Sequence, residues 1–558
     1  MELNHKEIVD NSTWKPNEIV ESFQFITKDK GQPNRRPRVY FTCHPDDFEK
    51  CFKKICDDFF KTQDCVIFYT ENMDADYSDT IWDTDLAEMN LFVVPVTYKL
   101  LRGGNRTTDV DVPYAFGRKI PVLPILMEPG KDLKEMFGYV FGKIQYLNPE
   151  PKDSTEIPYE DKLKNRLDVV LVGNELKEKI QSAFDAYIFL SYRKKDRVYA
   201  NQVMQIIHNH PFFRDIAIWY DEYLTPGENF EQEIQSAMNK SALIVLLVTN
   251  HLLENPNYVM KIEYPEARQR NKEILPIEVQ KTNRSELEVL FASIPPCVVG
   301  EEGIYSGIEH ALRKEILNKD YDSEHNYLIG MAYLNGIDVE KNVGRAFEMI
   351  LGAAEGGVSD AIGQIAEMYH SGMGVECDQQ KWIEWLNKGI LVATKEYGPE
   401  DERVLSKMED LAAAYGSLYK YQDALELYKK VYEIRKKVQG EEHLDTLRML
   451  HSMAYTYGEM GDYKTKYELE KKIYESQKKV LGEEHSATSA TLNNMVITYL
   501  NMGYYEKAIG LGKKAYESTK KVLGEEHPDT LTILSNMAST YGKLGDYKTE
   551  FELLKKSI

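Results

Sequence analysis

The sequence predicts a multidomain protein in which two α/β domains, each a parallel sheet with flanking helices, precede an all-α superhelical array of repeats. Three observations lead to this fold class. At 558 residues the chain is too long for a single hydrophobic core. Up to about residue 320, short β-branched and aromatic runs alternate with helical stretches, which is typical of parallel sheets covered by helices. In the remainder, similar segments recur at fixed intervals.

Composition and charge restrict the classes of function. Hydrophobic residues make up 42% of the chain and charged residues 28%, which is ordinary for a globular protein. The net charge of −21 argues against a general nucleic-acid or anionic-membrane binder, because both need a cationic surface. The longest apolar runs, such as 242–249, are too short to cross a bilayer, and the first residues lack the apolar core of a signal peptide. We therefore expect a cytoplasmic protein with no nucleic-acid or membrane partner.

The six cysteines do not form the pattern of a metal site. No two of them make a Cys-x-x-Cys pair, and four lie in a strand–helix–strand stretch of the first domain. Reduced, buried thiols are the simpler interpretation, and zinc or disulfide roles are the alternative. We predict no metal ligands.

Two kinds of repeat follow the α/β region. Gly-Glu-Glu-His begins at residues 440, 482 and 524, a constant spacing of 42, and each unit reads as two amphipathic helices joined by a tight turn containing glycine. Upstream, the pattern of 332–339 recurs at 368–375, a shift of 36. The units at 396–558 resemble kinesin-light-chain-type tetratricopeptide repeats, and those at 321–395 resemble Sel1-like repeats.

Such arrays stack helix pairs into a superhelix with a concave face, which usually holds a peptide or protein. We therefore expect a protein or peptide ligand on this superhelix. The regularly spaced tyrosines, such as Tyr457 and Tyr499, either pack between repeats or line the concave face.

The α/β region divides near residue 184. The first domain, 38–183, opens with a strand at 38–43 and carries a polar insertion at 148–159, whereas the second, 184–320, opens with a strand at 187–191. Residues 1–37 form an N-terminal extension without a persistent pattern.

In the second domain the opening strand ends in a polar, basic turn at 192–196. Further strands are expected at 216–220, 241–248 and 274–277, with helices from 198, over 228–238, and around Glu263 and Ala267. Ligands of open parallel sheets bind beyond the carboxyl ends of the strands, so an anionic ligand would dock at the basic turn.

The order and spacing of these pieces resemble the TIR (Toll/interleukin-1 receptor-like) domain. Its first box matches Phe189-Leu-Ser-Tyr192, and the loop after its second strand matches Asp221-x-x-Leu224-x-Pro-Gly227. The strand from Ser241 matches the third element of the family pattern. The resemblance covers most of 184–320 and implies a flavodoxin-like fold.

TIR domains include scaffolds that bind only other TIR domains and enzymes that cleave NAD+. The enzymes carry a glutamate four residues before a small residue, and Glu263 with Ala267 matches that spacing. The resemblance thus implies that Glu263 is catalytic. Glu266 is a rival carboxylate, but an α-helix would turn it away from the position of Glu263. The aromatic often found four residues before the glutamate is replaced by Val259, with Tyr258 one position away.

The chemistry explains why one carboxylate suffices. Breaking the nicotinamide–ribose bond gives an oxocarbenium-like transition state, and the cationic pyridinium leaves without a protonating acid. The reaction takes NAD+ as its substrate and needs neither a cofactor nor a metal.

The resemblance also implies a set of residues that bind NAD+. They are Phe189, Tyr192, Arg193, Lys194, Trp219, Asp221, Leu224 and Phe230. Arg193 and Lys194 would face the pyrophosphate, or are simple exposed turn charges. Trp219 and Phe230 would stack on a ring, or belong to the core.

The first domain follows the same plan but places Asp111 at the position of Glu263. The shorter side chain would misplace the carboxylate, and small displacements are costly where positioning matters. We therefore interpret this domain as a degenerate, inactive TIR-like partner or regulator of the second domain. An active variant is the alternative.

These observations favour an NAD+ glycohydrolase that releases nicotinamide and gives ADP-ribose or a cyclic form. We expect partner sensing through the repeats and self-assembly with other TIR domains to activate it, since constant NAD+ destruction would kill the host cell. Similar architectures occur in bacterial antiphage effectors, so the resemblance implies that role. The alternatives are a non-enzymatic TIR scaffold and a cyclase or base-exchange enzyme.

Overall fold

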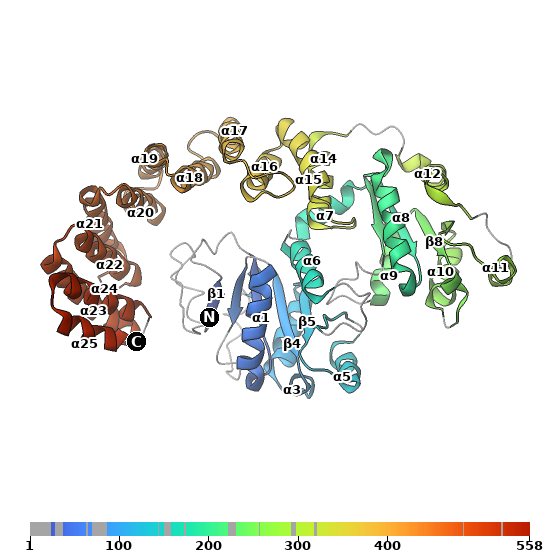
Figure 1. Ribbon diagram of the computed structural model, residues 1–558, viewed down its shortest axis with the longest axis horizontal. Coiled ribbons are helices and arrows are strands. Elements are labelled where there is room, and N and C mark those ends of the chain that lie inside the picture. The colour runs from blue at the N-terminus through green and yellow to red at the C-terminus, as the bar shows by residue number, and fades with distance from the viewer. Residues whose placement is uncertain are drawn as a thin grey trace. The chain divides into compact units, whose positions relative to one another are not determined.

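The computed structural model describes most of the chain. The described residues are 24–27, 37–62, 65–69, 86–142, 144–149, 158–171, 174–220, 230–255, 257–291, 297–316, 321–483, 485–525 and 528–557. They divide into two compact units, Arg36–Cys377 and Asp378–Ile558, the second grouped with residues 1–35 (Figure 1). Within the expected N-terminal extension lies a short strand, β1 (Gln24–Thr27).

The first α/β domain is built from short strands and the helices between them. Its elements are β2 (Arg38–Phe41), α1 (Phe48–Thr62), β3 (Val66–Tyr69), β4 (Leu91–Val96), α3 (Tyr98–Leu101), α4 (Val112–Gly117), β5 (Val122–Leu126), α5 (Lys131–Phe141), α6 (Tyr159–Leu171) and α7 (Asn174–Ala183). Every residue of β3, β4 and β5 is buried, because helices cover both faces of a parallel sheet.

The second α/β domain repeats this plan. Its elements are β6 (Ala186–Ser191), α8 (Arg197–Asn209), β7 (Ile216–Trp219), α9 (Phe230–Lys240), β8 (Leu243–Val248), α10 (Tyr264–Gln269), β9 (Glu273–Glu278), α11 (Arg284–Phe291), α12 (Gly300–Ala311) and α13 (Arg313–Ile316). The fully buried strand β8 lies at the centre, as its apolar sequence predicts.

Strand order is the same in both domains. The second sheet runs β7-β6-β8-β9 and the first contains β3-β2-β4-β5, with parallel neighbours throughout. A single parallel bridge continues each sheet, from Ile125 to Leu147 and from Ile277 to Val298. This is a flavodoxin-like order. The second strand, β7, lies on one side of the first, β6, and the later strands β8 and β9 lie on the other side. A ligand crevice is expected where the carboxyl ends of β6 and β8 diverge.

The first repeat packs against the second α/β domain within the same unit. It comprises α14 (Ser323–Asn335) and α15 (Val343–Glu355), and α16 (Ser359–Ser371) follows. The backbone N–H of Ile218 in β7 donates to the carbonyl of Asp338 at 2.9 Å, so the loop between α14 and α15 covers this edge strand. The Asp338 carboxylate also accepts hydrogen bonds from Gln181 and Tyr187, at 2.8 and 3.1 Å.

The other unit contains helix pairs of the 42-residue repeat. Its helices are α17 (Gln379–Tyr397), α18 (Glu402–Ser417), α19 (Tyr421–Val438), α20 (Leu444–Glu459), α21 (Tyr463–Val480), α22 (Ser486–Asn501), α23 (Tyr505–Leu523), α24 (Pro528–Leu544) and α25 (Tyr547–Ser557). The turn glycines Gly461 and Gly503 have φ angles of 79° and 78°, a left-handed conformation that favours glycine. Among the described helices, none is long and apolar enough to span a bilayer.

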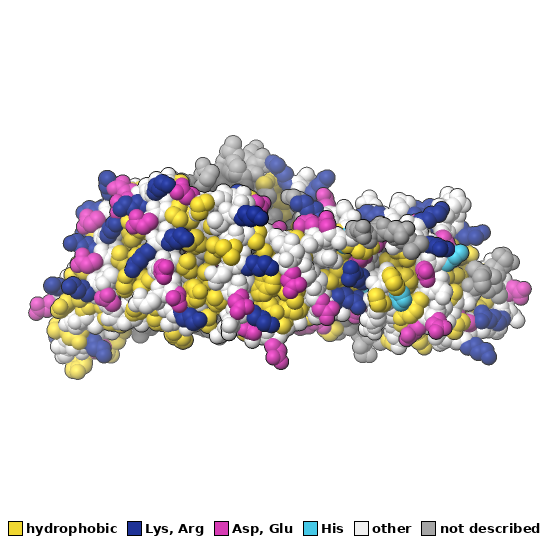
Figure 2. Space-filling model, turned by 90° about the horizontal axis from the view of Figure 1, so that it is seen from above, with side chains coloured by type: hydrophobic (Ala, Val, Ile, Leu, Met, Phe, Trp, Pro, Cys, Tyr) yellow, Lys and Arg dark blue, Asp and Glu magenta, His cyan; other side chains and the backbone are white. Residues whose placement is uncertain are grey.

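The Gly-Glu-Glu-His motif joins neighbouring repeats by charge. Glu441 accepts a hydrogen bond from Tyr432 at 3.1 Å and pairs with Lys472 of the next repeat at 2.5 Å, while Lys472 also donates to Tyr432 at 2.8 Å. Glu483 and Lys514 repeat this contact 42 residues later, at 2.6 Å. On the face in Figure 2 basic and acidic side chains are accordingly interspersed.

The histidine of the motif begins a helix. His443 Nδ1 accepts a hydrogen bond from the backbone N–H of Asp445, and His485 Nδ1 does the same for Ala487. These contacts satisfy donors at the start of α20 and α22 that have no partner inside the helix. In its described copies the motif therefore serves repeat structure, by starting a helix and pairing with the next repeat.

Glu470, buried in α21, predicts an unusual pH dependence of stability. Thr498 donates to it at 2.8 Å, yet burial raises the pKa of Glu470 from 4.5 to about 6. The folded protein favours the protonated, neutral form of Glu470. The contribution of this side chain to stability is therefore complete below pH 4.5 and is lost as the pH rises through 6. We expect Glu470→Gln to raise the free energy of unfolding of the repeats by about 2 kcal/mol at pH 7.5, and by less at pH 5.5.

Urea unfolding of the full chain, followed by circular dichroism at both pH values, measures this difference. Glu468→Gln, on the exposed side of the same helix, is the matched control and should leave stability unchanged. A Glu470→Gln variant that is less stable than wild type at pH 7.5 would contradict the assignment.

Candidate functional site

The carboxyl ends of β6 and β8 are joined by a buried carboxylate. Asp196, in the turn after β6, accepts hydrogen bonds from Thr249 Oγ1 and His251 Nδ1, each at 2.6 Å. Asp196 is 1% exposed, whereas His251 is 37% exposed. In the first domain Thr97 donates to Asp47 in the same way, at 2.7 Å. These contacts hold the two loops that flank the expected ligand crevice.

Glu263 lies at this end of the sheet. It is the last residue of a π-helix, Val259–Glu263, that leads into α10, and its side chain is half-buried. The hydroxyl of Ser191, the last residue of β6, donates to Glu263 Oε2 at 2.5 Å. The carboxylate predicted from spacing is therefore held beside the first strand, where ligands bind in folds of this order.

The π-helix has a local cause in the sequence. The N–H of Tyr264 bonds to the carbonyl of Val259, five residues earlier. Pro265 follows Glu263 by two positions; it lacks an N–H and crowds the carbonyl four residues before it, which favours the wider turn. Residues five apart therefore lie on one face, so Tyr258 shares the face of Glu263.

Tyr258 is the aromatic residue that the π-helix brings onto the face of Glu263, five positions before it. It is 41% exposed. Burial raises the pKa of Tyr258, and the negative charges of Glu263, Glu231 and Glu266 raise it further. Val259, at the position where the aromatic was sought, is buried. Sequence reasoning based on α-helical spacing named Tyr258 as one position away but gave it no role, and Pro265, which favours the π-helix, is the signal that would have done so.

The basic turn after β6 faces the loop after β8. Arg193 is half-buried and Lys194 is exposed. Lys195, which sequence reasoning did not single out, pairs with Glu254 at 2.8 Å. This hydrogen bond lowers the pKa of Glu254, and the charge of Arg193 contributes to the same shift. The turn thus places basic side chains directly after β6, and their role in binding an anionic ligand stays a prediction.

The aromatic residues predicted to bind NAD+ are more buried than the basic turn. Phe189 is 1% exposed and stacks on Trp219, with ring centroids 4.6 Å apart, in a cluster with residues of α9. Tyr192 is also buried, and its ring lies 6.3 Å from that of Tyr220. Phe189 and Tyr192 therefore both pack in the core, Phe189 because a parallel sheet covered by helices buries both faces of its strands. Trp219 remains half-buried.

Three other predicted residues are less fully placed. Phe230 is the first residue of α9, and nothing is described of its side chain. Asp221 and Leu224 lie outside the described residues. The rival Glu266 has its carboxylate 3.6 Å from Arg270, one turn along its own helix.

The first domain has an equivalent carboxylate with a different partner. Asp111 also ends a π-helix, Thr107–Asp111, and accepts a hydrogen bond from Thr42 at the end of the first strand, at 2.5 Å. It is 1% exposed, and Arg106 Nε lies 3.3 Å from its Oδ1. Burial raises the pKa of Asp111, and the charge of Arg106 acts in the opposite direction.

Comparison with known families decides the identity of the second domain. A family model described as the TIR domain matches residues 188–299. The chain carries a TIR domain. A model described as the tetratricopeptide repeat matches residues 403–465 and 487–558. The first α/β domain shares the fold of the TIR domain and its hydroxyl–carboxylate contact, but the TIR match covers the second domain alone.

Solved structures resemble the repeats. A kinesin light chain with nearly identical TPR-like repeats from Podosopora anserina is 25% identical, with 36% of this chain and 92% of that chain covered and a TM-score of 0.31. BtubC from P. vanneervenii is 16% identical over 43% and 90%, with a TM-score of 0.31. A Sel1 repeat protein from Oxalobacter formigenes is 16% identical over 46% and 92%, with a TM-score of 0.24. No curated protein matches the chain.

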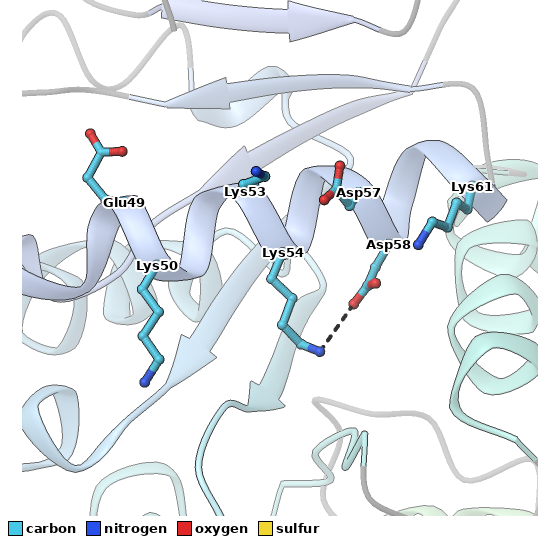
Figure 3. Close-up of a pocket in the computed structure, with 7 residues that line it drawn as sticks. All are labelled: Glu49, Lys50, Lys53, Lys54, Asp57, Asp58 and Lys61. Carbon is cyan, nitrogen blue, oxygen red and sulfur yellow. Dashed lines mark ion pairs between the residues drawn. The ribbon is translucent and has the colours of Figure 1, made fainter. Parts of the chain in front are cut away.

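A surface hollow of about 330 Å³ lies away from the TIR domain, along α1 of the first domain. Its lining residues are Glu49, Lys50, Lys53, Lys54, Asp57, Asp58 and Lys61. All come from one helix, and Lys54 pairs with Asp58 at 4.0 Å (Figure 3). Mixed charges on one exposed helix face are typical of solvated surface, so we assign no function to this hollow. Across the described part of the chain, no cluster of three or more metal-ligating side chains was found.

The two hydroxyl–carboxylate contacts differ in exposure and hence in energetic importance. We expect Thr42→Val to destabilise the first domain by about 1–3 kcal/mol, because Asp111 stays buried with one hydrogen bond fewer. Ser191→Ala should cost the TIR domain less than about 1 kcal/mol, because water can reach the half-buried Glu263.

Hydrogen exchange of peptides from β2 and β6, measured by mass spectrometry in the full chain, separates the two domains. Equal destabilisation by the two substitutions would show that exposure does not distinguish the carboxylates.

Proposed function

We propose that the TIR domain cleaves the bond between nicotinamide and ribose in NAD+. The observation that carries this proposal is the position of Glu263 at the carboxyl ends of the strands, fixed by Ser191 and sharing a helix face with Tyr258. A carboxylate here can stabilise the positive charge that develops on the ribose, while an aromatic ring beside it suits a planar cationic base.

The reaction needs few protein groups. As the bond between ribose C1′ and the pyridinium nitrogen breaks, its electron pair neutralises the ring and nicotinamide leaves uncharged. Water then adds to C1′ and loses a proton, which gives ADP-ribose; attack by an adenine nitrogen of the same molecule gives a cyclic form instead. Glu263 serves as an electrostatic stabiliser and hydrogen-bond acceptor for ribose hydroxyls.

The basic turn supports binding of the other half of NAD+. Arg193 and Lys194 lie directly beyond β6, where the anionic pyrophosphate is expected in a fold of this order. Trp219, at the carboxyl end of β7 and half-buried, remains a proposed stacking residue for a ring of the substrate.

The repeats suggest how activity is controlled. Tetratricopeptide arrays bind proteins or peptides, and TIR domains associate with one another. The first repeat contacts the TIR domain directly through Asp338 and Ile218, so binding to the array can bias the domain next to it. We propose that partner binding promotes TIR assembly and thereby NAD+ cleavage, a suitable arrangement for an antiphage effector in the cytoplasm.

A scaffold function is the second candidate, and one observation favours it. In the first domain the equivalent carboxylate is buried and paired with Arg106, so that domain retains the fold while lacking an accessible acid. If the second domain acts in the same way, both would serve as assembly surfaces.

Substitution of the proposed catalytic carboxylate tests the enzyme. We expect Glu263→Gln to reduce nicotinamide release from NAD+ by about 10²–10³-fold, because the amide cannot stabilise positive charge as a carboxylate does. Product chromatography of the full-length protein, with and without a crowding agent, measures the rate. Glu266→Gln, on the same helix and paired with Arg270, is the matched control and should retain activity.

Release that survives Glu263→Gln would mean that another residue is catalytic. No release by the wild-type protein under either condition would favour the scaffold.

Gating by assembly predicts a concentration dependence. Specific activity, meaning nicotinamide released per molecule per minute, should rise as the protein is concentrated or crowded, because more TIR domains are then in contact. Activity assays run in parallel with analytical ultracentrifugation compare rate with oligomeric state. A dilute monomer that is as active as the oligomer would exclude this form of control.

A further inference from the structure

The residue five positions before the carboxylate differs in charge between the two α/β domains. From the third strand onward the domains align with a constant difference in numbering, since 249 − 97, 257 − 105 and 263 − 111 all equal 152. By the same shift, Arg106 of the first domain corresponds to Tyr258 of the second. The same contact precedes both π-helices: Asn105 Oδ1 accepts a hydrogen bond from the backbone N–H of residue 108, and Asn257 Oδ1 accepts one from that of residue 260.

In the first domain this position holds a cation that closes the site. The π-helix brings residues five apart onto one face, and Arg106 Nε and Nη2 lie 3.3 and 3.4 Å from Asp111 Oδ1. The Arg106 side chain is only 10% exposed and that of Asp111 only 1%. The planar guanidinium of Arg106 thus binds the Asp111 carboxylate from within the same helix. A planar cation from solution would bind a free carboxylate at the same place.

In the second domain the same position holds a neutral ring. Tyr258 is 41% exposed and carries no positive charge, so it cannot supply the contact that Arg106 makes. The π-helix Val259–Glu263 has the same register as Thr107–Asp111, so Tyr258 lies on the helix face of Glu263 as Arg106 lies on that of Asp111. An aromatic face beside a carboxylate is the arrangement that binds planar aromatic cations.

We propose that the residue five positions before the carboxylate determines whether each domain accepts a ligand: Arg106 acts as a built-in counter-ion that closes the first domain, and Tyr258 leaves the second open to a planar aromatic cation. Under the proposed function that cation is the pyridinium of NAD+, so this inference rests on it and adds a specificity-determining residue. The first domain is then inactive mainly because its acid is already occupied, and the missing methylene of Asp111 is secondary.

Exchange of the two side chains tests this inference in the full-length protein. The probe is 1-methylnicotinamide, a planar aromatic cation without a ribose, which binds without being cleaved. Saturation-transfer NMR measures its affinity, and product chromatography measures NAD+ cleavage separately. We expect Tyr258→Arg to weaken probe binding about ten-fold or more, since the introduced guanidinium pairs with Glu263 and repels the cation. Tyr258→Phe, which keeps the ring, should bind the probe as the wild type does.

The reciprocal variant, Arg106→Tyr, should create a second probe site in the first domain, and thermal unfolding establishes whether it folds. If Arg106→Tyr does not fold, the Tyr258→Arg variant alone tests the inference. Tyr258 is exposed, so its replacement should leave the fold intact. Wild-type protein that does not bind the probe, or a Tyr258→Arg variant that binds it with unchanged affinity, would overturn the inference. The protein could also bind the probe through Tyr258 and yet not cleave NAD+. That result would support this inference and contradict the proposed NAD+-cleaving activity.

Discussion

A hydrogen bond from the end of the first strand to a carboxylate on a π-helix is the contact on which the site depends. Ser191 makes it with Glu263 and Thr42 makes it with Asp111. The strand is fixed in a buried parallel sheet, so the hydroxyl is rigid, and it determines where the acid stands relative to the strand ends. Everything proposed for the TIR domain requires the carboxylate to remain at that place.

The two α/β domains share the elements that position a carboxylate but differ in the residues around it. Both have the same strand order, a π-helix ended by an acid and a threonine that ties the loop after the third strand to a buried aspartate. They differ in what lies beside the acid. Arg106 neutralises a buried Asp111, whereas the half-buried Glu263 has Tyr258 on its face. The two domains thus share an architecture while their acids differ in exposure, because packing and accessibility depend on different residues.

The sequence predicted the fold because apolar runs such as Leu243–Val248 and the 42-residue spacing are strong signals. The resemblance to TIR enzymes pointed to Glu263 by its spacing to Ala267, and the structure places this carboxylate beside the end of β6 while its catalytic role stays a prediction. The sequence did not predict the π-helix, since the helix was read as α-helical, and Tyr258 was consequently noted only as one position away from the expected aromatic. The resemblance placed Phe189 among the NAD+-binding residues, whereas the structure packs it in the core, because strands covered on both sides bury the residues of both faces.

The contact between Asp338 and β7 limits how the molecule can polymerise. An uncovered outer strand is a template on which another chain can add hydrogen bonds. Here the backbone of the first repeat already accepts from Ile218, so strand addition on that side is blocked as long as the repeat stays docked. Pairing of β7 strands from two copies is therefore blocked while the repeat is docked, and any association of TIR domains would use helix faces or the opposite border of the sheet.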